Sequence, residues 1–243
     1  PDNTTATAGF AGNLSVGVTI NLGDVPASNG LTPAFSSLFS IDANGEVDFH
    51  RVNATAIQLA SFTLTPIGST YDDSPQNADG SCASGNSRNA LTQADLAFDV
   101  VDAAGTVLLT ASAQPTGTAE SLTGVLLSPP GNFFMRVYEV DAPTQSQLYK
   151  ATIQGTTTPT MAATDGTFTD KVRVTYTNVP GASSYRILRN TVNNQGTATI
   201  VGTSATTTFD DTTAVPLQSY FYWVQAAQGT ATFRDLAGPD AGF

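Results

Sequence analysis

The sequence predicts an all-β protein built from two tandem antiparallel β-sandwiches, and three observations lead to this prediction. Apolar and small polar residues alternate in short segments such as Leu14–Leu22 and Ala56–Leu64, and a period of two is the signature of a half-buried strand. No segment of convincing length follows the helix period. One stretch without apolar residues, 154–160, divides the 243 residues into two parts, each long enough to bury a core of its own.

The first part contains candidate strands separated by turns. Asn44-Gly45 lies between two extended runs and predicts a hairpin, because both residues tolerate positive φ. The turn Asp102–Gly105 predicts a second hairpin. Residues 68–90 are polar and lack periodicity, which indicates a long surface loop. The later strands expected in this part are Leu96–Val101, Thr106–Thr110, Leu122–Leu127, Phe133–Tyr138 and Leu148–Ile153.

The second part carries short strands at regular spacing, with a Pro-Gly turn inside 178–182. This pattern predicts a seven-stranded sandwich of the immunoglobulin or fibronectin type. The strands expected are Val172–Tyr176, Tyr185–Arg189, Thr199–Val201 and Tyr220–Ala226. We therefore expect one domain at 1–154, a linker at 155–160 and a second domain at 161–243.

Composition points to an extracellular protein. Only 12% of the residues are charged, the net charge is −11, and lysine occurs only at Lys150 and Lys171. Nucleic acid binding needs clustered Lys and Arg, which the sequence lacks. No apolar run is long enough to span a membrane. The sequence starts at Pro1 without a methionine, and we interpret it as part of a longer precursor that is secreted or displayed on a cell surface.

The sequence argues against most kinds of catalysis. It holds one histidine, His50, and one cysteine, Cys82, whereas a Ser-His-Asp or Cys-His site needs that imidazole beside a nucleophile, and a catalytic zinc needs several such ligands. We expect His50 to be an exposed or hydrogen-bonded strand residue and Cys82 to lie in a flexible loop. The chain is therefore predicted not to be an enzyme. Glycosidase chemistry, which needs only two carboxylates, is the alternative, since the chain has 20 acidic residues.

The acidic segment around Asn44-Gly45 is the candidate metal site, and calcium is the only candidate cofactor. Asp42, Asn44, Glu46 and Asp48 supply the hard oxygen ligands that calcium prefers. The alternative is that these side chains cap a turn by accepting hydrogen bonds from backbone amides. A second, weaker cluster in the long loop consists of Tyr71, Asp72, Asp73 and Asp79.

The run Tyr220–Trp223 is the candidate binding surface. On a strand, Tyr220 and Tyr222 share one face, and Phe221 and Trp223 share the other. One pair is expected in the core, and the other is a candidate stacking platform for sugar rings or another protein, formed from among Tyr220, Tyr222 and Trp223. The alternative is that a neighbouring element covers the second face. Phe133, Phe134 and Tyr138 pose the same question.

Three segments of the first part, in order, resemble the bacterial pre-peptidase C-terminal (PPC) domain. Ile41–Val52 is similar to the acidic hairpin of that family, Asp95–Leu108 to its central strand pair, and Gly131–Tyr138 to its G-x-Y-[YF]-[VI]-[RK]-V strand. The resemblance covers roughly residues 10–154 and implies a jelly-roll-type sandwich.

The second part resembles a fibronectin type III-like domain. Pro159–Tyr176 carries the opening pattern of bacterial versions, Val179–Arg189 matches the V-x-G-A-x-x-Y-x-[VI]-x-R turn and strand, and Tyr220–Ala226 matches the late Y-x-Y-x-V-x-A strand. Tyr176 stands where many relatives place tryptophan; both residues fill a core.

The two resemblances together imply a function. Proteins of this kind are secreted bacterial hydrolases, most often proteases, whose catalytic domain lies upstream and is missing from this sequence. We therefore expect a non-catalytic accessory region that binds an insoluble protein or polysaccharide substrate, or a surface. The alternative is a structural subunit of a surface layer, fibre or adhesin that binds like subunits. Pro1–Asn13 has no obvious partner strand in its own domain, so it is a candidate for pairing with a neighbour's sheet edge.

Overall fold

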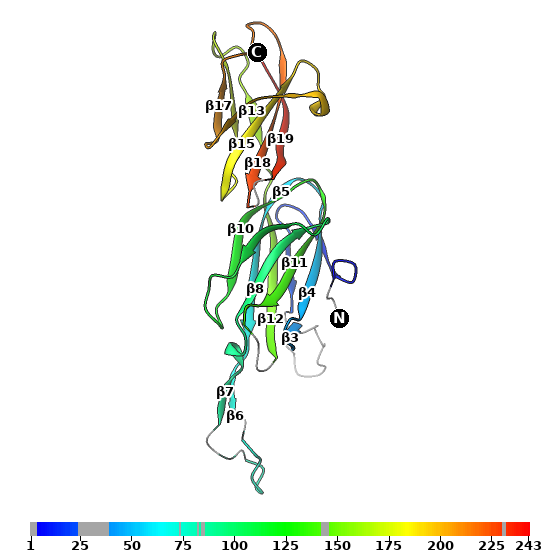
Figure 1. The fold of residues 1–243 in the computed structure, drawn as a ribbon, viewed down its shortest axis with the longest axis vertical. Coiled ribbons are helices and arrows are strands. Elements are labelled where there is room, and N and C mark those ends of the chain that lie inside the picture. Colours follow the sequence, from blue (N-terminus) through cyan, green and yellow to red (C-terminus); the bar gives the residue numbers. More distant parts are fainter. Residues whose placement is uncertain are drawn as a thin grey trace.

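The computed structural model describes residues 4–23, 39–72, 74–81, 83, 86–141, 146–229 and 232–243. Within these residues the fold is all-β, as the alternation predicted, and helical structure is limited to two 3₁₀ turns, η1 (Ala90–Thr92) and η2 (Gln195–Thr197). Figure 1 shows two β-sandwiches arranged end to end along the long axis of the molecule. No helix in the described part of the chain is long and apolar enough to cross a membrane.

The first sandwich packs two sheets against each other. The first sheet has the strand order β1 (Gly9–Leu14), β4 (Val47–Ala54), β11 (Gly131–Glu139), β8 (Leu96–Asp102), β9 (Val107–Ala111). The second sheet has the order β10 (Glu120–Leu127), β5 (Gln58–Ile67), β12 (Gln147–Thr157), β2 (Thr19–Leu22), and β3 (Phe39–Ile41) also pairs with β12.

The hydrophobic core of this sandwich lies between the two sheets. Successive residues of a strand point to opposite sides, and buried residues alternate with half-buried ones along most of β12. Phe62 and Tyr149 from the second sheet meet Phe98 and Met135 from the first in one buried cluster. Because a one-residue slip would turn every inward side chain outward, this cluster fixes the register of both sheets.

Residues 9–14 pair within their own domain, contrary to the expectation for Pro1–Asn13, of which residues 1–3 lie outside the described part of the chain. Strand β1 lies parallel to β4, with Phe10 opposite Arg51 and Leu14 opposite Ala54. Leu14 is fully buried in the core, which anchors the strand. The sequence showed no obvious partner for this segment, because the partner strand, which begins at Val47, is distant in the chain and runs parallel.

Residues 42–46 form a crossing between sheets and not the predicted hairpin. Gly45 has the positive φ expected of it, 79°, and the backbone amide of Glu46 donates to the carbonyl of Ala43. The flanking strands nevertheless separate, because β3 pairs with β12 and β4 pairs with β11. A turn signal specifies that the chain reverses, but it does not specify which sheet the next strand joins.

The hairpin predicted around Asp102–Gly105 is confirmed. Strands β8 and β9 pair antiparallel, and the Asp102 carboxylate accepts hydrogen bonds from the backbone amides of Ala104 and Thr106, each at 2.9 Å. The long loop predicted at 68–90 contains a short ribbon, in which β6 (Thr70–Asp72) pairs with β7 (Ser87–Asn89). This ribbon projects from the end of the first sandwich that faces away from the second (Figure 1).

The second sandwich has the three-plus-four arrangement expected of a seven-stranded fibronectin-type domain. The third sheet has the order β13 (Met161–Ala163), β14 (Val172–Tyr176), β17 (Thr208–Asp211). The fourth sheet has the order β16 (Thr199–Ser204), β15 (Ala182–Asn190), β18 (Tyr220–Gln228), β19 (Phe233–Gly242). Tyr185, Ile187, Tyr222 and Val224 lie in its core.

The predicted linker at 155–160 is shorter than expected. Strand β12 continues to Thr157 and pairs with β5, where Thr157 lies opposite Leu59. The hydroxyl of Thr156 donates to the carbonyl of Leu59 at 3.0 Å. A stretch without apolar residues can still extend a sheet, because its backbone supplies the hydrogen bonds. Only residues 158–160 separate the last strand of the first sandwich from β13.

The junction between the sandwiches is packed and hydrogen bonded. Leu59 and Leu126 of the first sandwich are buried in the core cluster of the second. The Gln228 side chain accepts a hydrogen bond from the Leu126 amide at 2.9 Å and donates to the carbonyls of Gly124 at 2.8 Å and Pro180 at 2.7 Å. These contacts restrict motion of one sandwich relative to the other.

Candidate functional site

The predicted calcium ligands point in different directions. The Glu46 carboxylate accepts hydrogen bonds from the backbone amides of Asp42 and Ala43 at 2.5 and 3.1 Å. The Asp48 carboxylate accepts a hydrogen bond from the hydroxyl of the buried Tyr149 at 2.6 Å. Glu46 thus caps the turn through backbone amides, which is the kind of role that the sequence left open as the alternative, whereas Asp48 is hydrogen bonded to a core hydroxyl.

The same turn borders a polar pocket of about 320 Å³. Glu139 on its wall accepts a hydrogen bond from the Gly45 amide at 2.8 Å, and Asn44 and Asp141 line the same pocket. Among the described residues, no group of three or more His, Cys, Asp or Glu side chains is arranged to hold a metal ion. The calcium site at Asp42, Asn44, Glu46 and Asp48 therefore stays a prediction without geometric support.

The acidic residues of the loop ribbon also have local partners. Asp72 accepts a hydrogen bond from the Ser74 hydroxyl at 2.9 Å. Asp79 accepts hydrogen bonds from the hydroxyl and the backbone amide of Ser81, which lower the pKa of Asp79. Asp73 and Cys82 lie outside the described residues, so the proposed cluster at 71–79 is placed only in part.

His50 is enclosed in the core of the first sandwich. Its imidazole is 2% exposed, lies 2.8 Å from the Tyr149 hydroxyl through Nε2, and packs against the edge of the Phe39 ring at 4.5 Å. His50 is therefore a hydrogen-bonded strand residue, one of the two forms that the sequence predicted for it.

The predicted binding surface at Tyr220, Tyr222 and Trp223 is wrong, because all three side chains are buried, with exposed fractions of 7%, 0% and 4%. Tyr222 donates a hydrogen bond to Asp211 at 3.0 Å. Its burial, together with the Asp211 charge, raises the pKa of Tyr222 well above its ordinary value.

Trp223 lies on the opposite side of β18 and is covered by elements distant in sequence. Gln195, in the connection between β15 and β16, reaches over the fourth sheet and donates to Asp235 on β19 at 2.6 Å. Gly238 on β19 approaches Trp223 so closely that a Cβ at that position would lie 2.8 Å from the indole. The residue pattern of β18 alone gives no indication that residues from other elements lie over Trp223.

The outer side of the first sheet carries a set of rings and guanidinium groups, which we call the aromatic face; Phe10 is exposed, Phe134 is buried, with 5% exposed, and the other members are half-buried. Its members are Phe10, Phe49, Arg51, Phe134, Arg136 and Tyr138. Along β4 the inward residues are His50 and Val52, so Phe49 and Arg51 point outward. Arg51 lies opposite Phe10 on one side and Phe134 on the other.

The rings and guanidinium groups of the aromatic face contact one another. The Arg51 guanidinium carbon lies 5.1 Å from the centre of the Phe10 ring, and that of Arg136 lies 5.5 Å from the Tyr138 ring. Both distances fall within the range of cation–π attraction. Phe49 and Phe134 meet edge to face at 6.3 Å. Phe10, at the edge of the sheet, is 55% exposed, whereas Phe134 is only 5% exposed.

The two arginines of the aromatic face differ in their electrostatic partners. Arg136 donates through Nε to the buried Asp99 carboxylate at 2.9 Å, and the Thr110 hydroxyl donates to the same carboxylate at 2.5 Å. Burial and the Asp99 charge raise the pKa of the neighbouring Tyr138. Arg51 forms no ion pair within the described part of the chain, and its Nε is buried without a hydrogen-bond partner.

A row of asparagines lies beside this arrangement. Asn53 on β4 lies opposite Asn13 on β1 and Asn132 on β11. Asn53 donates to the Asn13 side chain at 3.0 Å. Asn53 is the next outward residue after Arg51 on β4, and Asn13 and Asn132 flank it on the neighbouring strands. Aromatic rings, the Arg51 guanidinium and three side-chain amides are therefore neighbours on one surface.

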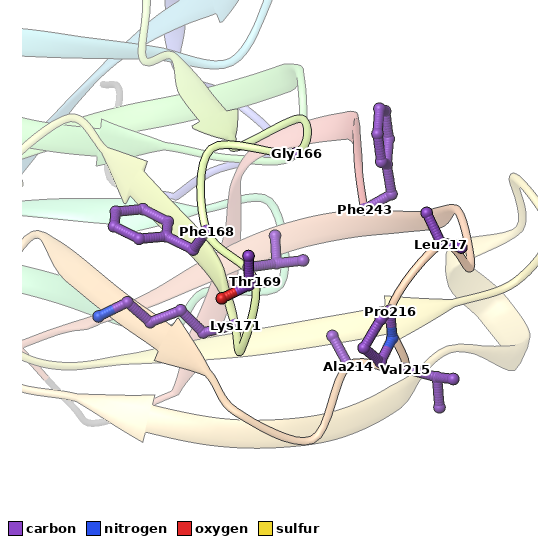
Figure 2. A pocket seen from close by; sticks show the side chains of 10 residues that line it. Gly166, Phe168, Thr169, Lys171, Ala214, Val215, Pro216, Leu217 and Phe243 are labelled. Atoms are coloured by element: carbon purple, nitrogen blue, oxygen red, sulfur yellow. The ribbon is translucent and has the colours of Figure 1, made fainter.

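A second candidate site is an apolar pocket of about 240 Å³ at the far end of the second sandwich. Figure 2 shows Leu217 and Phe243 at one edge and Phe168 and Lys171 at the other. Leu217 is 94% exposed and has a φ of 67°, a conformation that costs a leucine about 1–2 kcal/mol. The pocket is smaller than the usual small-molecule site and matches the size of one apolar side chain.

The cations beside this pocket are already paired. Phe168 lies under both Lys171 at 4.8 Å and Arg173 at 5.0 Å, and both cations bind the Asp210 carboxylate, at 2.8 and 2.7 Å. The hydrogen bonds from Arg173 and Lys171 hold the pKa of Asp210 far below its ordinary value. The pocket therefore offers apolar contact and no unpaired basic group among its described residues.

The sequence contained a usable signal for the aromatic face. In the segment 47–53, alternation places Phe49, Arg51 and Asn53 on one face. The opposite face holds Asp48, His50 and Val52, so the sequence shows which residues share a face but not which face is outward. The parallel partner that adds Phe10 had no such signal, because nothing in Gly9–Leu14 indicates which strand it joins.

No family model matches the chain, and no curated protein matches it, so the resemblance of the first part to the PPC domain is not confirmed. Solved structures with a similar fold include an Fn3-like protein from Clostridium thermocellum, at 24% identity and a TM-score of 0.32, covering 35% of this chain and 88% of that one. A pectate lyase from Pectobacterium carotovorum matches at 17% identity and a TM-score of 0.32, over 35% of this chain and 27% of the lyase.

A β-1,2-glucanase from Parabacteroides distasonis matches over 93% of this chain and 35% of the glucanase, at 10% identity and a TM-score of 0.31. Likenesses this distant concern the fold and carry no argument about a ligand. The all-β fold and the fibronectin-like second sandwich rest on the strand order of the third and fourth sheets.

Proposed function

We propose that this chain is the non-catalytic, substrate-binding accessory region of a secreted hydrolase, and that the aromatic face is its binding surface. The observation that carries the proposal is Phe10, whose ring is 55% exposed and held in place by the Arg51 guanidinium. An exposed ring with a fixed orientation is ready to stack on a flat ligand without losing further side-chain entropy.

The chemistry of the face fits a polymer. Rings and guanidinium planes spread over the outer side of a sheet offer an extended surface, whereas an enclosed site would suit a small molecule. The apolar C–H faces of sugar rings stack on aromatic rings, and asparagine amides such as those of Asn53 and Asn132 hydrogen bond to hydroxyl groups. We therefore favour a polysaccharide over an insoluble protein.

The packed junction supports an accessory role. Leu126 and Gln228 join the two sandwiches into one elongated body, so a catalytic domain attached to this chain would be held at a restricted distance from the bound polymer. Tethering of this kind raises the local concentration of catalyst at the substrate without changing the active site.

The observation that favoured the alternative function, a self-assembling structural subunit, no longer supports it. It rested on a free N-terminal strand, and Gly9–Leu14 is paired with β4 in its own sheet. The alternative that the chain is an enzyme would depend on its carboxylates alone, since its only imidazole, that of His50, is enclosed in the core.

Binding to insoluble polymers tests the proposal. Wild-type protein and Phe10→Ala would be mixed with cellulose, chitin, a gelled polyuronate and fibrous collagen, and the bound fraction measured after sedimentation. We expect binding to a polysaccharide, and a loss of about fivefold in affinity for Phe10→Ala. The matched control is Ile200→Ala, a comparably exposed residue (56%) of the second sandwich. The proposal fails if nothing sediments the wild type, or if Phe10→Ala binds as well.

A further inference from the structure

We infer that the aromatic face selects polysaccharides that carry carboxylate groups, such as those containing uronic acid residues, and that Arg51 is the residue that binds the carboxylate. This inference rests on the proposed function and adds the chemical class of the polymer.

The first step is the distribution of ion pairs. Five basic side chains are paired with carboxylates within the described residues, namely Arg136, Lys171, Arg173, Arg189 and Arg234. Arg51 lies on the same sheet as Arg136 but has neither an ion pair nor a side-chain hydrogen bond within the described chain. In this protein of net charge −11, Arg186 shares the lack of a carboxylate partner among the described residues, and of the two arginines only Arg51 lies on the aromatic face, beside Phe10.

The second step is the cost of leaving this group unpaired. The Arg51 Nε–H is buried and makes no hydrogen bond, and a buried donor without an acceptor destabilises a protein, more so when the group is charged. Because the Nε itself is closed to a ligand, an outside carboxylate would bind the remaining N–H donors of the Arg51 guanidinium, which have no carboxylate partner in the described chain. Arg51 sits between Phe10 and Phe134, so the acceptor would have to belong to a molecule lying over the rings.

The third step is the match between donor and acceptor. A guanidinium group presents planar, parallel N–H donors, and a carboxylate accepts two of them at once. A uronic acid residue joins that carboxylate to a sugar ring, which can stack on Phe10, while its hydroxyl groups can reach the amides of Asn53 and Asn132. The three kinds of contact occur side by side on the first sheet.

The charge of the chain argues against other anionic polymers. A nucleic acid or polyphosphate is bound by several clustered cations, and only one unpaired guanidinium is present on this face of the described chain, whose sequence has nine basic residues in all. One arginine suffices for one carboxylate. A glycan with carboxylates along its length is therefore the anionic polymer that this surface fits.

The test compares one polymer in two chemical states. Soluble polygalacturonate and its fully methyl-esterified form have the same backbone, but only the first carries carboxylates. Affinity would be measured by calorimetry for wild type, Arg51→Gln and Arg51→Lys. We expect wild type to bind the acid form about tenfold more tightly than the ester. Arg51→Gln should bind both forms equally, and Arg51→Lys should keep part of the preference.

Arg186→Gln is the matched control. The Arg186 guanidinium also stacks on a ring, that of Phe233 at 3.8 Å, but it lies on the fourth sheet, so its loss should change neither affinity. Thermal melting of each variant checks that the fold is intact. A folded Arg51→Gln that still prefers the acid form, a wild type that binds acid and ester equally, or equal binding of a sulfated glycan would overturn the inference. These outcomes leave polymer binding intact, whereas failure of the proposed function abolishes binding to every polymer tested.

Discussion

At the scale of single residues, Asp211 shows how a protein in which 12% of the residues are charged uses a buried carboxylate. This carboxylate is 1% exposed and accepts hydrogen bonds from Arg189 at 2.6 Å, the Thr213 hydroxyl at 2.7 Å and Tyr222 at 3.0 Å. Burial alone would raise its pKa, but these donors and the Arg189 charge outweigh burial and lower the pKa of Asp211. The ionised form therefore holds β17, β15 and β18 together.

This geometry predicts a pH dependence of stability. A carboxyl whose folded pKa is depressed stabilises the fold above its unfolded value of about 3.9, and that contribution is lost as the pH falls through the folded value. Asp211→Asn should lower the free energy of unfolding by roughly 3 kcal/mol at pH 7, because Arg189 loses its buried partner. In urea unfolding between pH 2 and 7, the gap between variant and wild type should narrow below pH 4. A gap that stays constant at low pH would contradict this role.

At the scale of elements, the crossing at 42–46 is held by carboxylates that act as hydrogen-bond acceptors. Glu46 accepts from two backbone amides, and Glu139 from β11 accepts from the Gly45 amide. Together they fix the point where the chain leaves β3 in the second sheet and enters β4 in the first. The acidic composition that suggested a metal site is thus explained by the needs of a tight crossing.

Removal of calcium should therefore leave the fold unchanged. We expect the same Tm in millimolar calcium and in chelator, because Glu46 and Asp48 already have protein donors. Glu46→Ala should lower the free energy of unfolding by about 1–3 kcal/mol in both solutions, since two backbone amides lose their acceptor. A rise in Tm with calcium that disappears in Asp42→Asn would restore the calcium prediction and refute this account of the turn.

An element could be predicted from the sequence when the residues that stabilise it are close together in the chain. The hairpin at 102–105 was predictable, because Asp102 and the two amides that it caps are neighbours in the sequence. The partner of β1 and the cover over Trp223 were not, because they depend on Val47–Ala54 and on Gln195, which lie far along the chain. The aromatic face was half predictable, since alternation along β4 groups Phe49 with Arg51, but the outward direction of that face is known only from the burial of His50 and Val52.

At the scale of the whole molecule, the junction decides whether the two sandwiches behave as one body. The second core includes Leu59 and Leu126 from the first sandwich. Arg234 on β19 crosses the junction to donate to the Ser128 carbonyl at 2.9 Å and to Asp102 at 2.7 Å. Burial opposes ionisation of Asp102, but the hydrogen bonds from Arg234 and the turn amides outweigh it, so the pKa of Asp102 is lowered.

This junction predicts that the wild-type protein unfolds in a single calorimetric transition, because the second core includes Leu59 and Leu126 of the first sandwich and is incomplete without them. Gln228→Ala leaves the Leu126 amide and the carbonyls of Gly124 and Pro180 without their partner. Each buried group left unpaired costs about 1–3 kcal/mol. We expect the variant to unfold in two separate transitions.

The matched control is Gln225→Ala, three residues earlier on the same strand. Gln225 donates to Asp235 at 2.9 Å within the second sandwich, so its loss should lower the Tm slightly and preserve a single transition. X-ray scattering adds an independent measurement, since a loosened junction should shorten the mean end-to-end dimension of Gln228→Ala and leave that of Gln225→Ala unchanged. If Gln228→Ala also melts in one transition with the wild-type dimension, the apolar contacts of Leu59 and Leu126 hold the sandwiches together without the hydrogen bonds.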